Sequence, residues 1–215
     1  MISVAPIRQA LPDGSVATIP ATWAEYEEYA RSRGDRSIPR FKYANGLLHL
    51  KMPTFEHGQL DAIVADLIVW ILNQQLRDYT RTTPVTLKVP KQAGIEPDHC
   101  FWIEHWRAVN GKKRIDLATD PPPDIVIEVD VTNFTQVDDY QPFKVPEVWL
   151  IRADRLEIFS LAPNRYVLTD TSRFFPDIAV QQVYGSILGA IAEGASLPRA
   201  IRQATPDYLN DGQRD

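Results

Sequence analysis

The sequence is poor in cysteine and has no long apolar run. Its 215 residues include one cysteine, Cys100, so an internal disulfide is excluded and an oxidising compartment is not required. The most apolar stretch, residues 63–72, is interrupted by Asp66 and is too short to span a bilayer. The first residues also lack the basic and apolar pattern of a signal peptide. We therefore expect a cytoplasmic protein without a membrane segment.

Basic charge is not in excess either. The chain has 23 Lys and Arg against 28 Asp and Glu, a net charge of −5, which argues against binding to nucleic acid by charge alone but does not exclude a nuclease. Between residues 115 and 143 all charged residues are acids, a pattern more typical of a cation site than of a phosphate-binding face. The basic residues cluster at 31–42, 77–91 and 107–114. We interpret these clusters as solvated surface, with contact to backbone phosphates as the alternative.

Length and composition favour one compact domain. With 44% hydrophobic and 24% charged residues, the chain can bury a sizeable core. Residues 1–20 contain three prolines and no periodicity, and we predict an irregular leader there. The single domain is expected to span 21–204, followed by a frayed polar tail at 205–215.

Local signals define the first half of the domain. Thr22 and Glu25 form a capping box that predicts a helix over 23–33, ended by Gly34. Asn45-Gly46 between two alternating apolar runs predicts a hairpin over 40–52. Apolar residues at helical spacing from Leu60 onwards predict a long amphipathic helix over 56–78.

The second half is dominated by predicted strands. We expect strands at 82–89, 98–103, 125–130, 147–151, 155–160 and 166–169, a short helix over 132–143 and a helical pair over 183–203. We expect Trp102 and Trp149 to fill the core. Strands in the middle with helices before and after predict an α/β or α+β fold.

Two acids at predicted strands are candidates for chemistry. Alternation places Glu128 on the face of its strand opposite Ile125 and Ile127, and Asp98 lies at the mouth of another strand. Glu56 lies four residues before Leu60, so we expect it on the buried stripe of the long helix, facing the sheet. Its neighbour His57 is interpreted as a surface residue, with orientation of Glu56 or of a water as the alternative.

Three such acids suit Mg²⁺ or Mn²⁺, which prefer carboxylate and water ligands, and not zinc, because His and Cys have no zinc spacing here. A cation would bind a phosphate oxygen and activate a water. Spacing alone leaves an alternative open, in which Glu128 is paired inside the sheet and Asp98 caps a turn.

Several ordered motifs carry a family resemblance. Residues 96–98 (EPD), 122–129 (PPDIVIEV) and 145–150 (VPEVWL) resemble the Uma-two family of endonuclease-like proteins in the restriction-endonuclease-like PD-(D/E)XK superfamily. The segments 22–29, 43–53, 55–58 and 114–121 also resemble that family, so the likeness covers about residues 20–180. It implies a mixed β-sheet flanked by helices and phosphodiester hydrolysis by metal-activated water. It also implies that Asp98 and Glu128 bind the metal together with Glu56, the acid carried by the helix.

One departure concerns a lysine. In the superfamily pattern a Lys two residues after the strand Glu stabilises charge on the phosphate, but Asp130 stands here, and Gln136 stands at the helical position used by many relatives. The remaining candidates are Lys88 and Lys144. Lys88 could face the acids or be a solvated strand lysine.

The sequence thus predicts a Mg²⁺- or Mn²⁺-dependent endonuclease acting on DNA, with a homodimer as a possible assembly. Asp98 and Glu128 are the expected catalytic acids, assisted by Lys88 or Lys144. The alternative is a catalytically impaired nuclease fold serving as a nucleic-acid-binding or assembly module. A glycosidase with paired carboxylates is disfavoured because no sugar cleft is indicated.

Overall fold

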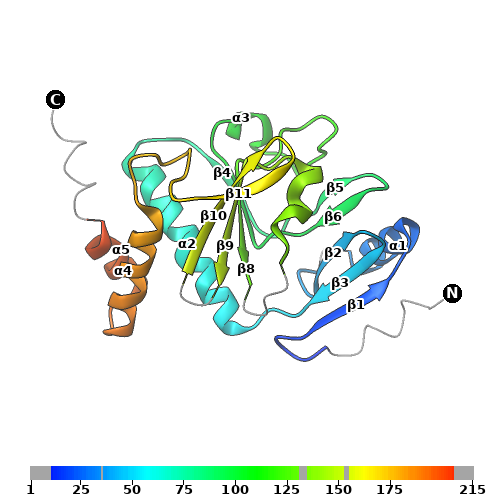
Figure 1. Cartoon of the computed structure of the whole chain (residues 1–215), viewed down its shortest axis with the longest axis horizontal. Helices are drawn as coiled ribbons and strands as arrows, with labels where there is room; N and C mark the ends of the chain where they lie inside the picture. Colours follow the sequence, from blue (N-terminus) through cyan, green and yellow to red (C-terminus); the bar gives the residue numbers. More distant parts are fainter. Residues whose placement is uncertain (1–10, 35, 131–134, 153–154, 206–215) are drawn as a thin grey trace.

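The computed structural model describes residues 11–34, 36–130, 135–152 and 155–205, which form two β-sheets. The small sheet has the order β1-β3-β2-β6-β5, and the large sheet has the order β11-β10-β9-β8-β7-β4. Figure 1 shows the small sheet beside the large one, on the side opposite the C-terminal helices. The strands are β1 (Val16–Pro20), β2 (Arg40–Ala44), β3 (Leu47–Lys51), β4 (Thr80–Thr82), β5 (Leu87–Val89), β6 (Ala93–Ile95), β7 (His99–Trp102), β8 (Ile125–Val129), β9 (Glu147–Arg152), β10 (Arg155–Ala162) and β11 (Arg165–Thr169).

The small sheet packs its apolar face on the first helix. Helix α1 (Trp23–Arg33) begins with the predicted capping box and ends at Gly34, and the β2–β3 turn has positive φ at both Asn45 and Gly46. Phe41, Tyr43, Leu48 and Leu50 pack on Tyr26 and Tyr29 of α1. Because side chains alternate along a strand, Arg40, Lys42, His49 and Lys51 lie on the opposite face of the hairpin.

Position 94 requires glycine because helix α1 packs closely against it. A Cβ at this position would overlap the hydroxyl and Cζ atoms of Tyr26. We expect Gly94→Ala to destabilise the protein by about 1–3 kcal/mol, the usual cost of overpacking. Gly58→Ala is the matched control: a Cβ there meets no atom within 4 Å, so the change should stabilise helix α2 (Phe55–Gln74) by about 0.5–1 kcal/mol. Urea unfolding of both variants measures these changes in the free energy of unfolding. Equal stability of the two variants would contradict the packing.

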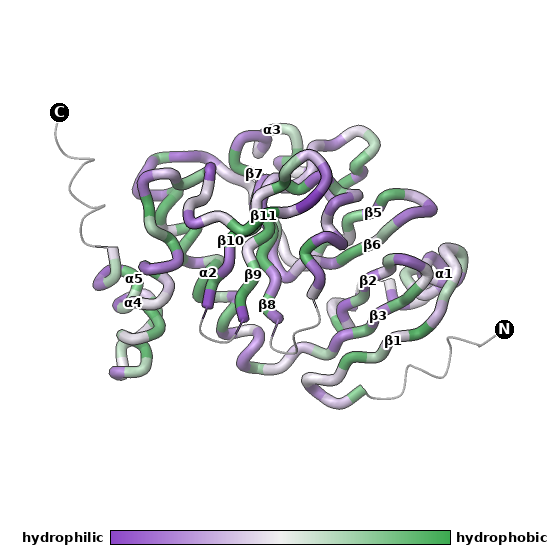
Figure 2. The backbone as a smooth tube through the Cα atoms, viewed as in Figure 1, coloured by the Kyte–Doolittle hydropathy of each residue, from purple (hydrophilic) through white to green (hydrophobic). Residues whose placement is uncertain are grey.

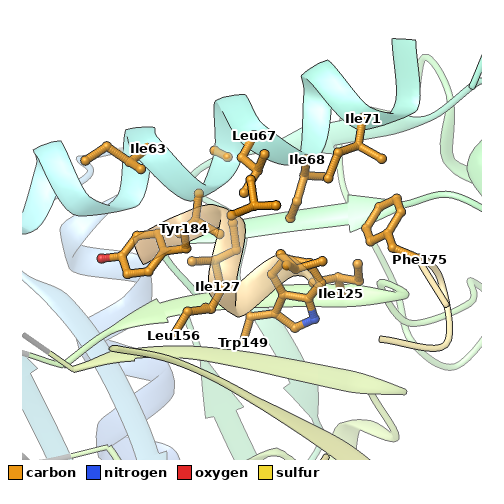
Figure 3. Close-up of a cluster of buried hydrophobic side chains, with 14 of the residues drawn as sticks. Ile63, Leu67, Ile68, Ile71, Ile125, Ile127, Trp149, Leu156, Phe175 and Tyr184 are labelled. Carbon is orange, nitrogen blue, oxygen red and sulfur yellow. The ribbon is translucent and has the colours of Figure 1, made fainter. Parts of the chain in front are cut away.

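The large sheet buries one face under helix α2. Ile63, Leu67, Ile68 and Ile71 of α2 meet Ile125 and Ile127 of β8 and Trp149 of β9 (Figure 3). Helices α4 (Val180–Ala192) and α5 (Leu197–Ala204) cover the rest of this face. The predicted helical pair is confirmed, and α2 ends four residues earlier than the predicted 78.

The other face of the large sheet holds a second core. Cys100, Trp102, Val126 and Val148 of the sheet pack against Tyr140 and other apolar residues of the opposing layer. This layer includes β5, β6 and the 3₁₀ helix η2 (Val137–Phe143), which connects the parallel strands β8 and β9. The short helix α3 (Trp106–Val109) adds Val109. Trp102 and Trp149 are both fully buried, as predicted.

The predicted mixed α/β fold, with sheets flanked by helices, is confirmed. Figure 2 shows the central strands of the large sheet as predominantly hydrophobic. Within the described residues, no helix is both long and apolar enough to cross a membrane.

Three local predictions are wrong. The leader is not irregular over its last residues, because Val16–Pro20 forms β1 and pairs with β3. The single strand predicted at 82–89 is two strands, β4 and β5, which belong to different sheets. Strand β6 was not predicted, because Ala93–Ile95 is too short to show alternation. Residues 1–10, 131–134 and 206–215, including most of the predicted tail, lie outside the described residues.

Candidate active site

The candidate site lies where the chain passes from the small sheet to the large one. Strand β6 ends at Ile95, Glu96 and Pro97 follow, and β7 starts one residue after Asp98. The chain makes a second passage between β3, which ends at Lys51, and α2, which starts at Phe55. Both passages thus place side chains of the small sheet near the end of β8.

Asp98 is buried and held from two sides. Its Oδ2 accepts a hydrogen bond of 2.9 Å from the backbone N–H of Val129, and its Oδ1 lies 2.9 Å from Nε2 of His57. The Nε atom of Arg40 lies 4.0 Å from Oδ1. Burial alone would raise the pKa of Asp98, but His57, Lys51 and Arg40 together outweigh it and hold this pKa below its ordinary value. Asp98 is therefore ionised at neutral pH.

Glu128 is buried at the end of β8, on the face that it shares with Val126. The Tyr140 hydroxyl donates a hydrogen bond to its Oε1. Burial, and next the negative charge of Asp98, raise the pKa of Glu128 to about 8, against the opposing effects of Lys51, Tyr140 and Lys42. At neutral pH this carboxyl group thus carries a proton, and the acid pair holds about one negative charge.

The polar face of the β2–β3 hairpin is turned toward these acids. The Nζ atom of Lys42 donates to Oδ2 of Asp139 at 2.6 Å, and Nζ of Lys51 donates to the carbonyl oxygen of Val129 at 2.6 Å. Since Val129 follows Glu128 directly, Lys51 lies beside the acid pair.

A pocket joins the acids and the cations. Its cavity volume of about 40 Å³ exceeds the ~10–15 Å³ that one water needs. The lining residues come from both sheets and from the segment after β8: Arg40, Phe41, Lys42, His49, Lys51, Ile95, Glu96, Asp98, Glu128 and Thr135. Glu96, the third acid in the pocket, forms an ion pair with Arg33 and accepts a hydrogen bond of 2.9 Å from Thr86.

The structure brings Asp98 and Glu128 together, as the sequence predicts, but it does not place Glu56 with them. Glu56 is exposed and His57 is buried, so the expectation that Glu56 lies on the buried stripe is wrong. The stripe runs through His57, Leu60 and Val64, at spacings of three and four, which leaves Glu56 outside it. The interpretation of His57 as a surface residue is wrong for the same reason.

Neither predicted lysine faces the acids. Lys88 is exposed on β5, and its Nζ lies 5.6 Å from the centroid of the Tyr26 ring. Lys144 is also exposed, and it ends η2 with a left-handed backbone (φ 57°). The lysines that line the pocket are Lys42 and Lys51. The alternation of the hairpin could have identified their common face, but not the acids opposite it.

The remaining motif acids have structural partners. Asp124 accepts hydrogen bonds from the backbone N–H groups of Ile103 and Glu104, at 2.6 and 2.8 Å. Together with Glu104 and His105 it forms a group of potential metal ligands within the described residues, but these bonds already explain its burial. Asp130 accepts a hydrogen bond of 2.8 Å from the N–H of Thr135 and lies 3.7 Å from Nε of Arg152.

Glu147 of the VPE segment links β9 to the segment before α4. Its carboxylate accepts hydrogen bonds from the Trp149 indole at 2.9 Å, the Ser172 hydroxyl at 2.7 Å and the Arg173 N–H at 2.7 Å. Three donors satisfy this fully buried acid. The motif glutamate therefore stabilises the fold and lies outside the pocket lining.

Comparison with known proteins identifies the family of this chain. The profile of the Uma2 family, described as "Putative restriction endonuclease", matches residues 23–187. The chain belongs to the Uma2 family. The match spans helix α1, the hairpin, both pocket acids and the VPE segment, so the family resemblance seen in the motifs is confirmed.

A solved structure shows the same fold. It is a protein from Anabaena variabilis, titled a "putative nuclease belonging to DUF820", with a TM-score of 0.51 and 16% sequence identity. The alignment covers 86% of this chain and 99% of that one. No curated protein matches the sequence. This Uma2 protein thus has a mixed α/β fold, with two sheets flanked by helices, that is similar to the fold of that solved structure.

Proposed function

We propose that this Uma2 protein is a metal-dependent endonuclease that hydrolyses phosphodiester bonds in DNA. The observation that carries the proposal is the meeting of Asp98 and Glu128, two buried acids, in an open pocket whose opposite wall is cationic. A buried acid pair with a strongly perturbed pKa, set in a pocket, is typical of a functional site. Family membership supports a nucleic acid as the substrate.

The residues present fit Mg²⁺ or Mn²⁺. Both cations prefer oxygen ligands, and the pocket offers the carboxylates of Asp98 and Glu128. The raised pKa of Glu128 supports this fit, because burial and next the charge of Asp98 disfavour its ionised form, which a bound cation would stabilise. When bound, such a cation supplies Lewis acidity toward a phosphate oxygen and toward the attacking water.

The side chains of the chain itself have distinct roles in this proposal. Asp98 and Glu128 would hold the cation, while His57 fixes the orientation of Asp98 through the 2.9 Å contact. Tyr140 fixes the orientation of Glu128. Arg40 and Lys42 offer positive charge to the phosphate backbone at the pocket wall.

A binding or assembly module without catalysis is the second candidate. Asp130 and Gln136 favour it, because they stand at the two positions where the family resemblance places the lysine. In that case the acid cluster would affect stability and no cleavage would occur.

Cleavage of supercoiled plasmid, single-stranded DNA and RNA by the purified full chain separates the two candidates. We expect nicking of DNA with Mg²⁺ or Mn²⁺ and none with EDTA. Absence of cleavage with either metal, from protein shown to be folded, would contradict the endonuclease and favour the binding module. Preference for RNA would contradict the DNA substrate.

The proposed homodimer, which would place two sites on a duplex, is tested by sedimentation equilibrium.

A further inference from the structure

Among the pocket cations, Lys51 is distinguished by its partner. Lys42 is paired with the carboxylate of Asp139, and Arg40 lies nearest to Asp98. Lys51 instead donates to a neutral carbonyl, that of Val129. Within the described residues, no carboxylate oxygen lies within 4.0 Å of its Nζ atom. Its positive charge is therefore not neutralised by direct contact with an acid.

Lys51 is nevertheless close enough to act on both acids. Its charge lowers the pKa of Asp98 and that of Glu128, and all three residues line the same pocket. An ammonium group has three N–H donors, and the structure records one protein acceptor for this one. The pocket that Lys51, Asp98 and Glu128 line has a cavity volume of about 40 Å³, which is room enough for a phosphate oxygen between the cation and the acids.

The fold holds this position firmly. Lys51 is the last residue of β3 and pairs in register with both Arg40 of β2 and Val16 of β1. The bond to Val129 ties the end of β3 to the strand that carries Glu128. A lysine at a strand end with a fixed Nζ meets the requirement that a catalytic donor is oriented before the substrate arrives.

We propose that Lys51 is the catalytic ammonium group of this nuclease and replaces the lysine missing at Asp130 and Gln136. This inference rests on the endonuclease proposed above. The oxygen of a water bonds to phosphorus while one P–O ester bond breaks, the water releases one proton to solvent, and the departing oxygen takes up a proton from solvent. Lys51 donates to a non-bridging phosphate oxygen and stabilises the negative charge that develops there.

The test compares two lysines of the same sheet. Lys51→Met keeps most of the aliphatic side chain and removes the charge, and Lys88→Met makes the identical change at the exposed lysine of β5. With Mg²⁺ and supercoiled plasmid, we expect Lys51→Met to cleave about 10²-fold to 10³-fold more slowly than the unmodified chain, the usual cost of losing one such donor. Lys88→Met should cleave at the unmodified rate.

Two further variants guard against a folding defect. Lys51→Gln removes the charge but retains an N–H donor for Val129, and Lys51→Arg retains the charge. We expect the Gln variant to be as slow as the Met variant and the Arg variant to recover part of the rate, because guanidinium binds phosphate in a different geometry.

Calorimetric titration with Mn²⁺ gives a readout that does not depend on cleavage. Because Lys51 repels a cation, its removal should leave the Mn²⁺ affinity unchanged or increase it. Loss of Mn²⁺ binding together with cleavage would assign Lys51 a structural role and overturn the inference. Cleavage within about threefold of the unmodified rate by a folded Lys51→Gln variant would overturn it as well. If the unmodified chain cleaves no DNA, the proposed function fails and the inference falls with it.

Discussion

Replacing Asp98 with Asn is expected to reduce metal-dependent DNA cleavage by on the order of 10³-fold, the upper end of what the loss of one preorganised electrostatic group costs. Asp98 is the acid that is ionised at neutral pH, so it supplies most of the charge that attracts a cation. The amide oxygen of Asn can still accept the Val129 N–H, so we expect the fold to persist. Plasmid nicking measures the expected loss of cleavage, and Mn²⁺ calorimetry measures the expected loss of metal binding.

Glu104→Gln is the matched control for Asp98→Asn. It removes one exposed carboxylate from the group formed by Glu104, His105 and Asp124, the other cluster of potential ligands in the described part of the chain. This control should cleave DNA and bind Mn²⁺ like the unmodified protein. If Glu104→Gln were impaired and Asp98→Asn were not, the active site would lie at the other cluster.

Glu128→Gln is expected to be more stable than the unmodified protein at pH 8 in EDTA, and the difference should shrink as the pH falls. The folded-state pKa of Glu128 is raised to about 8 from 4.5, mainly by burial and by the charge of Asp98. Between these two values the unfolded chain releases its proton while the folded chain retains it. Stability from this group is therefore present below the unfolded pKa and is lost as the pH rises.

The expected slope is about 1.4 kcal/mol per pH unit for one proton, so the difference amounts to a few kcal/mol by pH 8. Gln resembles the protonated acid and its oxygen can still accept the Tyr140 hydroxyl, so the variant lacks this titration. Urea unfolding at pH 5, 6, 7 and 8 gives both curves. A difference that does not vary with pH would contradict the raised pKa of Glu128.

Mg²⁺ should counteract the loss of stability that the ionisation of Glu128 causes as the pH rises. A cation held by the ionised carboxylate stabilises the folded chain, and this effect should increase from pH 6 to pH 8. The Glu128→Gln variant should gain much less from Mg²⁺ at every pH. Equal stabilisation of both proteins would place the cation away from Glu128.

Local sequence signals predicted those elements that are determined by neighbouring residues. The capping box at Thr22 and Glu25 and the turn at Asn45-Gly46 each define an element through contacts within a few residues. Alternation in β8 also predicted correctly that Glu128 lies on the face opposite Ile125 and Ile127; the structure adds that these two isoleucines pack with α2 and that Glu128 lines the pocket.

Properties set by contacts between the sheets could not be predicted in this way. Glu56 and His57 are adjacent, and about 100° of helix rotation decides which one is buried. The sequence does not give that rotation directly, because Leu60 is four residues from one and three from the other. From the sequence alone, Lys51 cannot be distinguished from a solvated strand lysine. Only the passage of the chain from β6 to β7 places Asp98 opposite the hairpin and so brings Lys51 into the same pocket.

The most direct test of the Asp98–Glu128 centre is a crystal structure of the full chain soaked in Mn²⁺, with its anomalous signal. Our account predicts a peak in the pocket with carboxylate oxygens of both Asp98 and Glu128 as ligands. A peak at Glu104, His105 and Asp124 with none in the pocket, or no peak at concentrations that support cleavage, would contradict it.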